Sequence, residues 1–281
     1  MCSLTALSLL FVGALGVCNI FAVESPPGIS AAEIMKKVAE NQDREQKERV
    51  SFIYEESVRV ATRRSNGKLA REELTNSLVT PTPHGIEKKR ESIKGRYWYK
   101  GRYIDFGGDP VPNSDTLDGG LTSSFRDGLT NGTSKDGIGK HLFPLTSDEQ
   151  KDLKFELAGE ETVSGRKAFH IRFAPKDKAD FAWAGEAFID KDEFQPIWVY
   201  THLSRRIPFL VRDLLGTDVP GLGFNTRYAR IDKDVWFPVS FGTEFRLRAV
   251  FFINRTITVS IENKNFRRAV VDSQVHYGNE P

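Results

Sequence analysis

Residues 159–176, GEETVSGRKAFHIRFAPK, and residues 185–200, GEAFIDKDEFQPIWVY, decide the fold of this chain. In both stretches apolar and polar side chains alternate, and this period of two is typical of a β-strand with one buried face. Phe169, Ile171 and Phe173 fall on one face of the first strand. A Gly-Arg pair before that strand and the run DKDE in the second stretch predict tight turns. The two stretches therefore predict antiparallel strands joined by short turns.

Further strands follow on both sides of this region. Residues 50–64 and 69–79 alternate in the same way around Ser-Asn-Gly-Lys at 65–68, a strong hairpin signal. After residue 222 the chain alternates almost to its end, as a meander does. The pattern predicts a mainly β fold, with a single antiparallel domain of about ten strands.

Two or three helices complete the expected architecture. Ser30 and Glu33 have the spacing of a capping box, and they predict a helix start. A short apolar face within IPFLVRDLLG predicts another helix over 207–215. Gly, Asp, Ser, Thr and Asn without periodicity over about 107–139 predict a long flexible loop, either a lid or an insertion.

The N-terminal 22 residues have no charged side chain and end at an alanine before a polar, proline-rich stretch. They are interpreted as a secretory signal peptide, with residues 23–281 as a single β domain. The alternatives are an uncleaved membrane anchor or a lipid anchor at Cys18, because Leu-Gly-Val-Cys partly matches a lipobox. Cys2 and Cys18 both lie in this segment, so a chain that begins at Val23 has no disulfide.

Composition excludes some classes of function. Lys and Arg number 40 and Asp and Glu number 38, so no basic excess indicates a nucleic-acid partner. Arg205, Arg206 and Arg212 form a small basic group that indicates either transient contact with a membrane surface or a solvated rim. Twenty Phe in short alternating runs indicate sheets with large apolar faces, or a lined cavity.

No catalytic or cofactor motif accompanies these strands. Gly-x-Ser-x-Gly, a P-loop and a complete dinucleotide fingerprint are absent from the sequence. No pair of histidines has metal-ligand spacing, and Asp190–Glu193 lacks the spacing of a calcium loop. The sequence predicts neither a metal nor a cofactor, and a protein that is not an enzyme. A hydrolase with a dispersed site is a rival interpretation.

The turns and strand ends resemble those of the LolA-like superfamily, which includes outer-membrane lipoprotein-sorting proteins and RseB/MucB-type periplasmic proteins. The resemblance rests on ten residues, with Trp-Phe-Pro at 236–238 as a further match. The ten are Gly159, Glu161, Val163, Gly165, Arg166, Pro175, Lys176, Ile189, Asp190 and Pro196. It implies a curved antiparallel sheet that forms a half-open barrel covered by helices.

The resemblance also implies a function. The expected protein is a periplasmic carrier for a lipid, a lipoprotein acyl chain or another hydrophobic ligand. The alternative is an envelope sensor that binds a protein partner through the same fold. Six residues are the candidates to line a hydrophobic cleft: Phe169, Phe173, Trp198, Phe209, Leu210 and Phe251. A solid core filled by such side chains is the competing interpretation of the same pattern.

Overall fold

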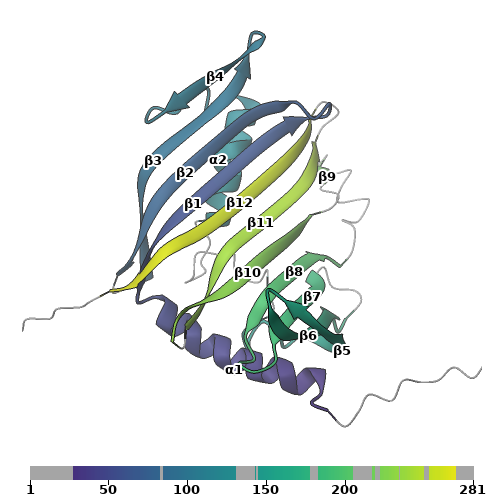
Figure 1. Cartoon of the computed structure of the whole chain (residues 1–281). Helices are drawn as coiled ribbons and strands as arrows, with labels where there is room; N and C mark the ends of the chain where they lie inside the picture. Colours follow the sequence, from purple (N-terminus) through teal and green to yellow (C-terminus); the bar gives the residue numbers. More distant parts are fainter. Residues whose placement is uncertain are drawn as a thin grey trace, which may run out of the picture.

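The computed structural model describes residues 28–82, 85–130, 143, 145–177, 183–204, 217–218, 222–233, 235–249 and 253–269. These residues form one 12-stranded sheet in the order β4-β3-β2-β1-β12-β11-β10-β8-β7-β6-β5, with β9 paired to β11. Every pairing is antiparallel. The sheet is curved and its two ends, β4 and β5, stay apart (Figure 1). The mainly β, antiparallel and half-open architecture predicted from the sequence is confirmed.

The strands follow the alternation in the sequence. Their bounds are β1 Phe52–Arg64, β2 Leu69–Thr82, β3 Gly85–Tyr99, β4 Arg102–Gly107, β5 Leu153–Val163, β6 Arg166–Pro175, β7 Trp183–Asp190, β8 Pro196–Leu203, β9 Thr217–Asp218, β10 Gly223–Asp232, β11 Val235–Ala249 and β12 Ile253–Arg268. The hairpin expected at 65–68 joins β1 to β2.

Helix α1 (Ala31–Arg49) begins where the capping box predicts. The Ser30 hydroxyl accepts a hydrogen bond from the Glu33 amide, and the Glu33 carboxylate accepts one from the Ser30 amide. Its buried side includes Ile34, Met35 and Val38, which belong to the main hydrophobic core. The helix runs across one end of the sheet (Figure 1).

Helix α2 (Leu117–Thr130) corrects the expectation of an unstructured loop over 107–139. Leu117, Leu121 and Phe125 recur every four residues, and the polar and glycine-rich sequence between them conceals this helical period. Thr116 caps the helix, because its hydroxyl accepts a hydrogen bond from the Gly119 amide at 3.2 Å. Figure 1 shows α2 against one side of the β1–β2 region, so this part of the range is an ordered cover.

The two stretches that open the sequence analysis set the register of the β5–β8 region. Ser164 and Gly165 both have positive φ, at 51° and 79°, and form the turn between β5 and β6. The Asp190 carboxylate accepts backbone hydrogen bonds from Asp192 and Glu193, which closes the next turn. Arg166 donates to the side chains of both Asp190 and Glu193. These two ion pairs therefore join the β5–β6 hairpin to the β7–β8 hairpin.

The buried apolar residues define a core face of the sheet, and both helices pack on it. Several expectations lie outside the described residues: the signal peptide over 1–22, the lipid anchor at Cys18 and the helix over 207–215. Of the helices in the described ranges, none combines the length and the apolar character that a membrane span requires.

Candidate binding site

The core face has two halves of different chemistry. Strands β6, β7, β8, β10, β11 and β12, which we call the apolar half, carry Ile171, Ala187 and Val199 among other buried residues. Strands β1–β3 form the polar half, because their core-facing positions include the buried Arg71 and Glu73. Helix α2 lies between the halves: its Phe125 packs against the ring of Phe245, while its Arg126 reaches the polar half.

Glu73 is the centre of a buried ion network in the polar half. Arg71 donates to one Glu73 oxygen through Nε at 2.8 Å, and Arg126 donates to the other through Nη1 at 3.1 Å. The Arg71 guanidinium also lies 5.0 Å from the centre of the Phe106 ring. Gly95 makes room for that ring, since a Cβ at this position would lie 2.7 Å from it. Charges buried this deeply are tolerated because each is paired and hydrogen-bonded.

Two further ion pairs lie beside this network. Lys88 Nζ donates to both Glu56 oxygens, at 2.8 and 2.9 Å, and the Glu56 carboxylate is buried. Arg90 pairs with Asp109, which follows β4. The charges thus come from β1, β3 and the chain after β4, and meet only because the sheet brings these segments together.

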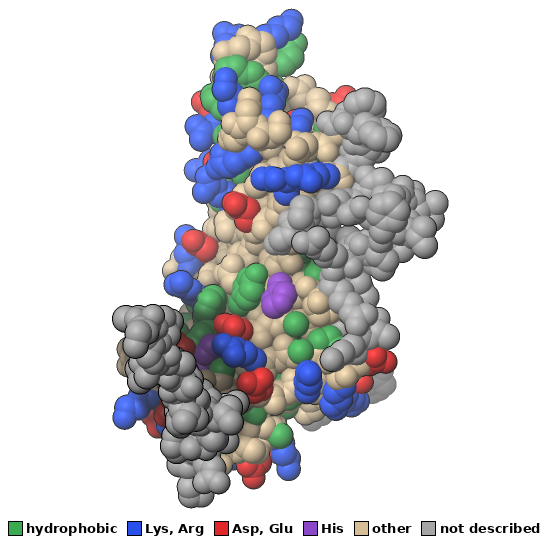
Figure 2. Space-filling model, turned by 90° about the vertical axis from the view of Figure 1, so that its right-hand side faces the viewer, with side chains coloured by type: hydrophobic (Ala, Val, Ile, Leu, Met, Phe, Trp, Pro, Cys, Tyr) green, Lys and Arg blue, Asp and Glu red, His purple; other side chains and the backbone are tan. Residues whose placement is uncertain are grey.

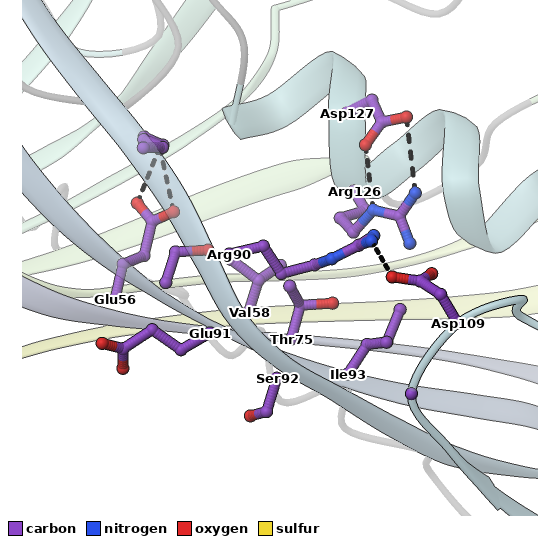
Figure 3. Close-up of a pocket in the computed structure, with 13 residues that line it drawn as sticks. Glu56, Val58, Thr75, Arg90, Glu91, Ser92, Ile93, Asp109, Arg126 and Asp127 are labelled. Atoms are coloured by element: carbon purple, nitrogen blue, oxygen red, sulfur yellow. Dashed lines mark hydrogen bonds and ion pairs between the residues drawn. The ribbon is translucent and has the colours of Figure 1, made fainter.

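A pocket of about 430 Å³ lies among these groups. Val58, Thr75 and Ile93 contribute to it from three neighbouring strands, and Figure 3 shows them below the Arg90 side chain. The remaining lining residues are Glu56, Ser77, Lys88, Arg90, Glu91, Ser92, Gly108, Asp109, Arg126 and Asp127. Figure 3 shows the side chains of Glu91 and Ser92 pointing away from α2. The volume is within the range of small-molecule sites, about 300–1,000 Å³.

A second pocket, of about 540 Å³, lies over β5–β8. Ala174, Ala184 and His202 line it and alternate with core residues of their strands, so their side chains point away from the core. Lys154, Phe155, Glu156, Arg172, Phe173, Gly185 and Glu186 complete the lining. Figure 2 shows this side of the molecule: hydrophobic and histidine side chains gather in its lower part, and Lys and Arg predominate above.

The six residues predicted to line a hydrophobic cleft do not form one described group. Phe169 and Phe173 are buried in the apolar half on the core face. Trp198 lies opposite Phe188 across β7 and β8 and stacks on its ring at 5.2 Å. Trp198 alternates with the buried Ile197 and Val199, so it points to the face away from Phe169. Phe209, Leu210 and Phe251 lie outside the described residues.

A buried carboxyl group fastens α1 to the sheet. Glu45 accepts hydrogen bonds from the Gln195 side chain and, at 3.2 Å, from the Trp236 amide. Burial raises the pKa of Glu45 to about 7, against the opposing attraction of Arg49. Arg49 in turn donates to the Trp236 carbonyl at 2.8 Å. Glu45 and Arg49 satisfy the backbone amide and carbonyl of Trp236 beneath the helix, and neither residue lines either pocket. The network is therefore structural.

The described residues contain no group of three or more His, Cys, Asp or Glu that could hold a metal ion. The pocket beneath α2 was not predicted from the sequence. Its signal was present in the runs of charged residues along β2 and β3, REE at 71–73 and EKKRE at 87–91. Which of these charges face the core depends on strand register, including the bulge between Asn76 and Ser77.

No protein-family model matches the chain, and no curated protein matches it in sequence. Among solved structures, an outer-membrane lipoprotein-sorting protein domain from Vibrio parahaemolyticus matches at 11% identity and a TM-score of 0.37, over 83% of this chain and 93% of that one. A LolA superfamily protein from Nitrosomonas europaea matches at 10% identity and a TM-score of 0.35, over 87% and 96%. The Pseudomonas aeruginosa MucA/MucB complex matches at 12% identity and a TM-score of 0.23, over 83% and 99%. The superfamily that the sequence resembles is thus among the matches.

Proposed function

We propose that this protein is a non-enzymatic binding protein that takes a hydrophobic or lipid-modified ligand onto the core face of its open sheet. The observation that supports this is the pocket beneath α2, where apolar and charged surfaces meet. Val58 and Ile93 supply apolar surface there, and Arg90 and Arg126 supply charge. A ligand with an apolar chain and a polar end matches both kinds of surface.

Binding of this kind needs no bond to be made or broken. Each CH₂ group that leaves water for the apolar surface contributes about 0.8 kcal/mol. The chain would extend from the pocket beneath α2 toward the apolar half, where Phe125 meets Phe245. The chain would pass beside α2, and a helix of 14 residues is marginal unless its contacts hold it.

The contacts that hold α2 are few and of two types. Leu121 and Phe125 pack against the apolar core. Asp118 accepts from Arg255 Nε at 2.7 Å, and Arg126 donates to Glu73. Both pairs are largely buried, so α2 is released from them only where another charged group replaces the lost partner. The proposed place of action is a cell envelope, on the basis of the leader-like residues 1–22.

Native mass spectrometry of the full chain, purified from its own envelope fraction, tests the function. The expected result is a bound mass that organic extraction releases as a lipid. A clean apo mass contradicts the proposal if a fluorescent C12 fatty acid also fails to bind saturably. Co-purification of a second protein without extractable lipid favours the sensor alternative instead.

A matched pair of variants places the ligand. Ser77→Phe puts a large side chain into the pocket, and it is expected to weaken binding of the fatty acid at least tenfold. Ser57→Phe adds the same volume to the adjacent strand β1, and it is expected to leave binding unchanged, because Ser57 alternates with the pocket-lining Glu56 and Val58 and is absent from the lining. Equal effects of the two variants would mean that the ligand binds elsewhere.

A further inference from the structure

We infer that the pocket beneath α2 binds the phosphate group of an amphiphile through Arg90 and Arg126, and that this group replaces the carboxylates of Asp109 and Asp127. The inference rests on the proposed function, because it names the polar end of the ligand. It concerns only the charged part of the site.

The two guanidinium groups converge on one place. Arg90 comes from β3 and Arg126 from α2, and both line the pocket. Figure 3 shows the two side chains pointing toward one another in the space between the strands and the helix. Guanidinium groups bind phosphate oxygens in pairs of parallel hydrogen bonds, so two that converge can hold one phosphate between them.

The carboxylates now beside these arginines are exchangeable. Asp109 pairs with Arg90, and Asp127 accepts from Arg126 Nε at 2.9 Å. The side chains of Asp109 and Asp127 are 60% and 54% exposed. Exposed ion pairs contribute only about 0–1 kcal/mol, because both charges remain well hydrated when they separate. A ligand with two or more anionic oxygens can therefore replace both carboxylates.

The charges that stay in place favour a doubly charged anion. Lys88 is paired with the buried Glu56, and Arg71 and Arg126 share the buried Glu73, whereas the exposed carboxylates Asp109 and Asp127 pair with Arg90 and Arg126. Glu73 serves two arginines at once, so its network has an excess of positive charge. A phosphate monoester carries about −1.5 to −2 at neutral pH, so it supplies about as much negative charge to the two arginines as the two aspartates that it displaces.

Thr75 gives a second, independent indication. Its hydroxyl lines the pocket, the residue is 6% exposed, and Oγ1 has no hydrogen-bond partner among the described residues. Figure 3 shows it below the Arg90 side chain. A buried hydroxyl without a partner forfeits its hydrogen bonds to water, so an acceptor in the pocket would satisfy it. A phosphate oxygen held by Arg90 would accept from this hydroxyl.

Calorimetric titration of the full chain tests the inference with four probes. They are dihexanoyl phosphatidic acid below its micelle concentration, dihexanoyl glycerol, glycerol 3-phosphate and inorganic phosphate. We expect phosphatidic acid to bind at least tenfold more tightly than each of the other three. Dihexanoyl glycerol measures the contribution of the acyl chains without the phosphate. Glycerol 3-phosphate and inorganic phosphate measure how well a phosphate binds without acyl chains.

Two variants and one control locate the phosphate. Arg90→Gln is expected to weaken phosphatidic acid about tenfold and to leave dihexanoyl glycerol unchanged. Arg96→Gln is the control, because Arg96 lies on the same strand, is similarly exposed and is absent from the pocket. Asp109→Asn removes a carboxylate that the ligand must displace, so it is expected to strengthen binding about threefold or more.

The possible failures are distinct. Equal binding of phosphatidic acid and dihexanoyl glycerol overturns the phosphate site and leaves the proposed function standing. Inorganic phosphate that binds as tightly as the lipid overturns the amphiphile as the source. If Arg90→Gln and Arg96→Gln act alike, or if Asp109→Asn weakens binding, the assignment to these residues is overturned. Absence of binding to all four probes overturns the inference, whereas the function is overturned only if the native mass is also apo and the C12 fatty acid fails to bind.

Discussion

One continuous sheet carries two halves that are stabilised in different ways. In the apolar half, residues such as Ile171 and Val199 are completely buried, and contact with any apolar neighbour satisfies them. In the polar half, Arg71 and Glu73 are buried nearly as deeply and depend on specific partners. Apolar burial stabilises without directional demands, whereas a buried ion pair can be close to neutral overall and costly only when broken. The apolar half is therefore the scaffold, and the polar half is the part whose contacts a ligand can exchange.

The largest change in stability is expected for a variant in the apolar half. Ile171→Ala leaves a cavity among residues that cannot collapse, and the free energy of unfolding should fall by about 4 kcal/mol. The neighbouring Arg172→Ala, on the exposed face, should change it by less than about 0.5 kcal/mol. Urea denaturation of both variants measures the difference. If the two variants were equally destabilised, the apolar half would not be the scaffold.

The next test lies in the polar half and uses a pair of changes. Glu73→Leu leaves Arg71 buried without its carboxylate, so the free energy of unfolding should fall by about 3 kcal/mol. When Arg71→Met is added, most of this loss should be recovered, because no unpaired charge then remains buried. The same urea denaturation measures both variants. A double variant as unstable as the sum of the single ones would show that the network itself stabilises the sheet.

Local sequence predicted the apolar half well and the polar half poorly. The strands around Gly165 and Asp190 were predictable because alternation and turn chemistry act over a few residues. The pocket was not, because Glu56, Thr75 and Lys88 come from three strands and meet only in the correct register. Bulges shift that register by one residue, and each shift moves a side chain to the other face.

The candidate residues show the same limit. Alternation placed Phe169 and Phe173 together correctly, since both belong to one strand. It could not place Trp198 relative to them, because the faces of β6 and β8 are related only through β7 and its bulge beside Ile189. Helix α2 escaped prediction because its apolar period, Leu117, Leu121, Phe125 and Leu129, is set among glycine and polar residues that are typical of loops. The positions of Trp198 and α2 depend on contacts between segments far apart in the chain, and local sequence patterns do not predict such contacts.

Glu45 provides a pH-dependent test, because it is a titratable carboxyl group that is buried between helix α1 and the sheet. Its pKa is raised from 4.5 to about 7 by burial, so folding favours its protonated form. The stabilisation is complete below pH 4.5 and is lost as pH rises through about 7. Between pH 5 and pH 7 the free energy of unfolding should fall by about 2 kcal/mol from this group.

The variant Glu45→Gln separates this contribution from those of other groups. Its stability should be lower at pH 5 but nearly independent of pH over the same window, since an amide does not titrate. Glu40→Gln, at an exposed position of the same helix, should retain the slope of the native chain. Urea denaturation at several pH values measures all three proteins. An unchanged slope in Glu45→Gln would assign the pH dependence to another group.

The smallest expected effects concern the stability of α2 itself, and they oppose each other in sign. A Cβ at Gly120 meets nothing within 4 Å, so Gly120→Ala should stabilise the helix by about 1 kcal/mol. Thr116→Ala removes the N-cap and should destabilise it by about 1 kcal/mol. Amide hydrogen exchange should therefore slow about fivefold in α2 for the first variant and quicken about fivefold for the second, with exchange in β6–β8 unchanged. Exchange that changed equally in α2 and in β6–β8 would mean that the helix opens only with the whole sheet, and that the two halves are one cooperative unit.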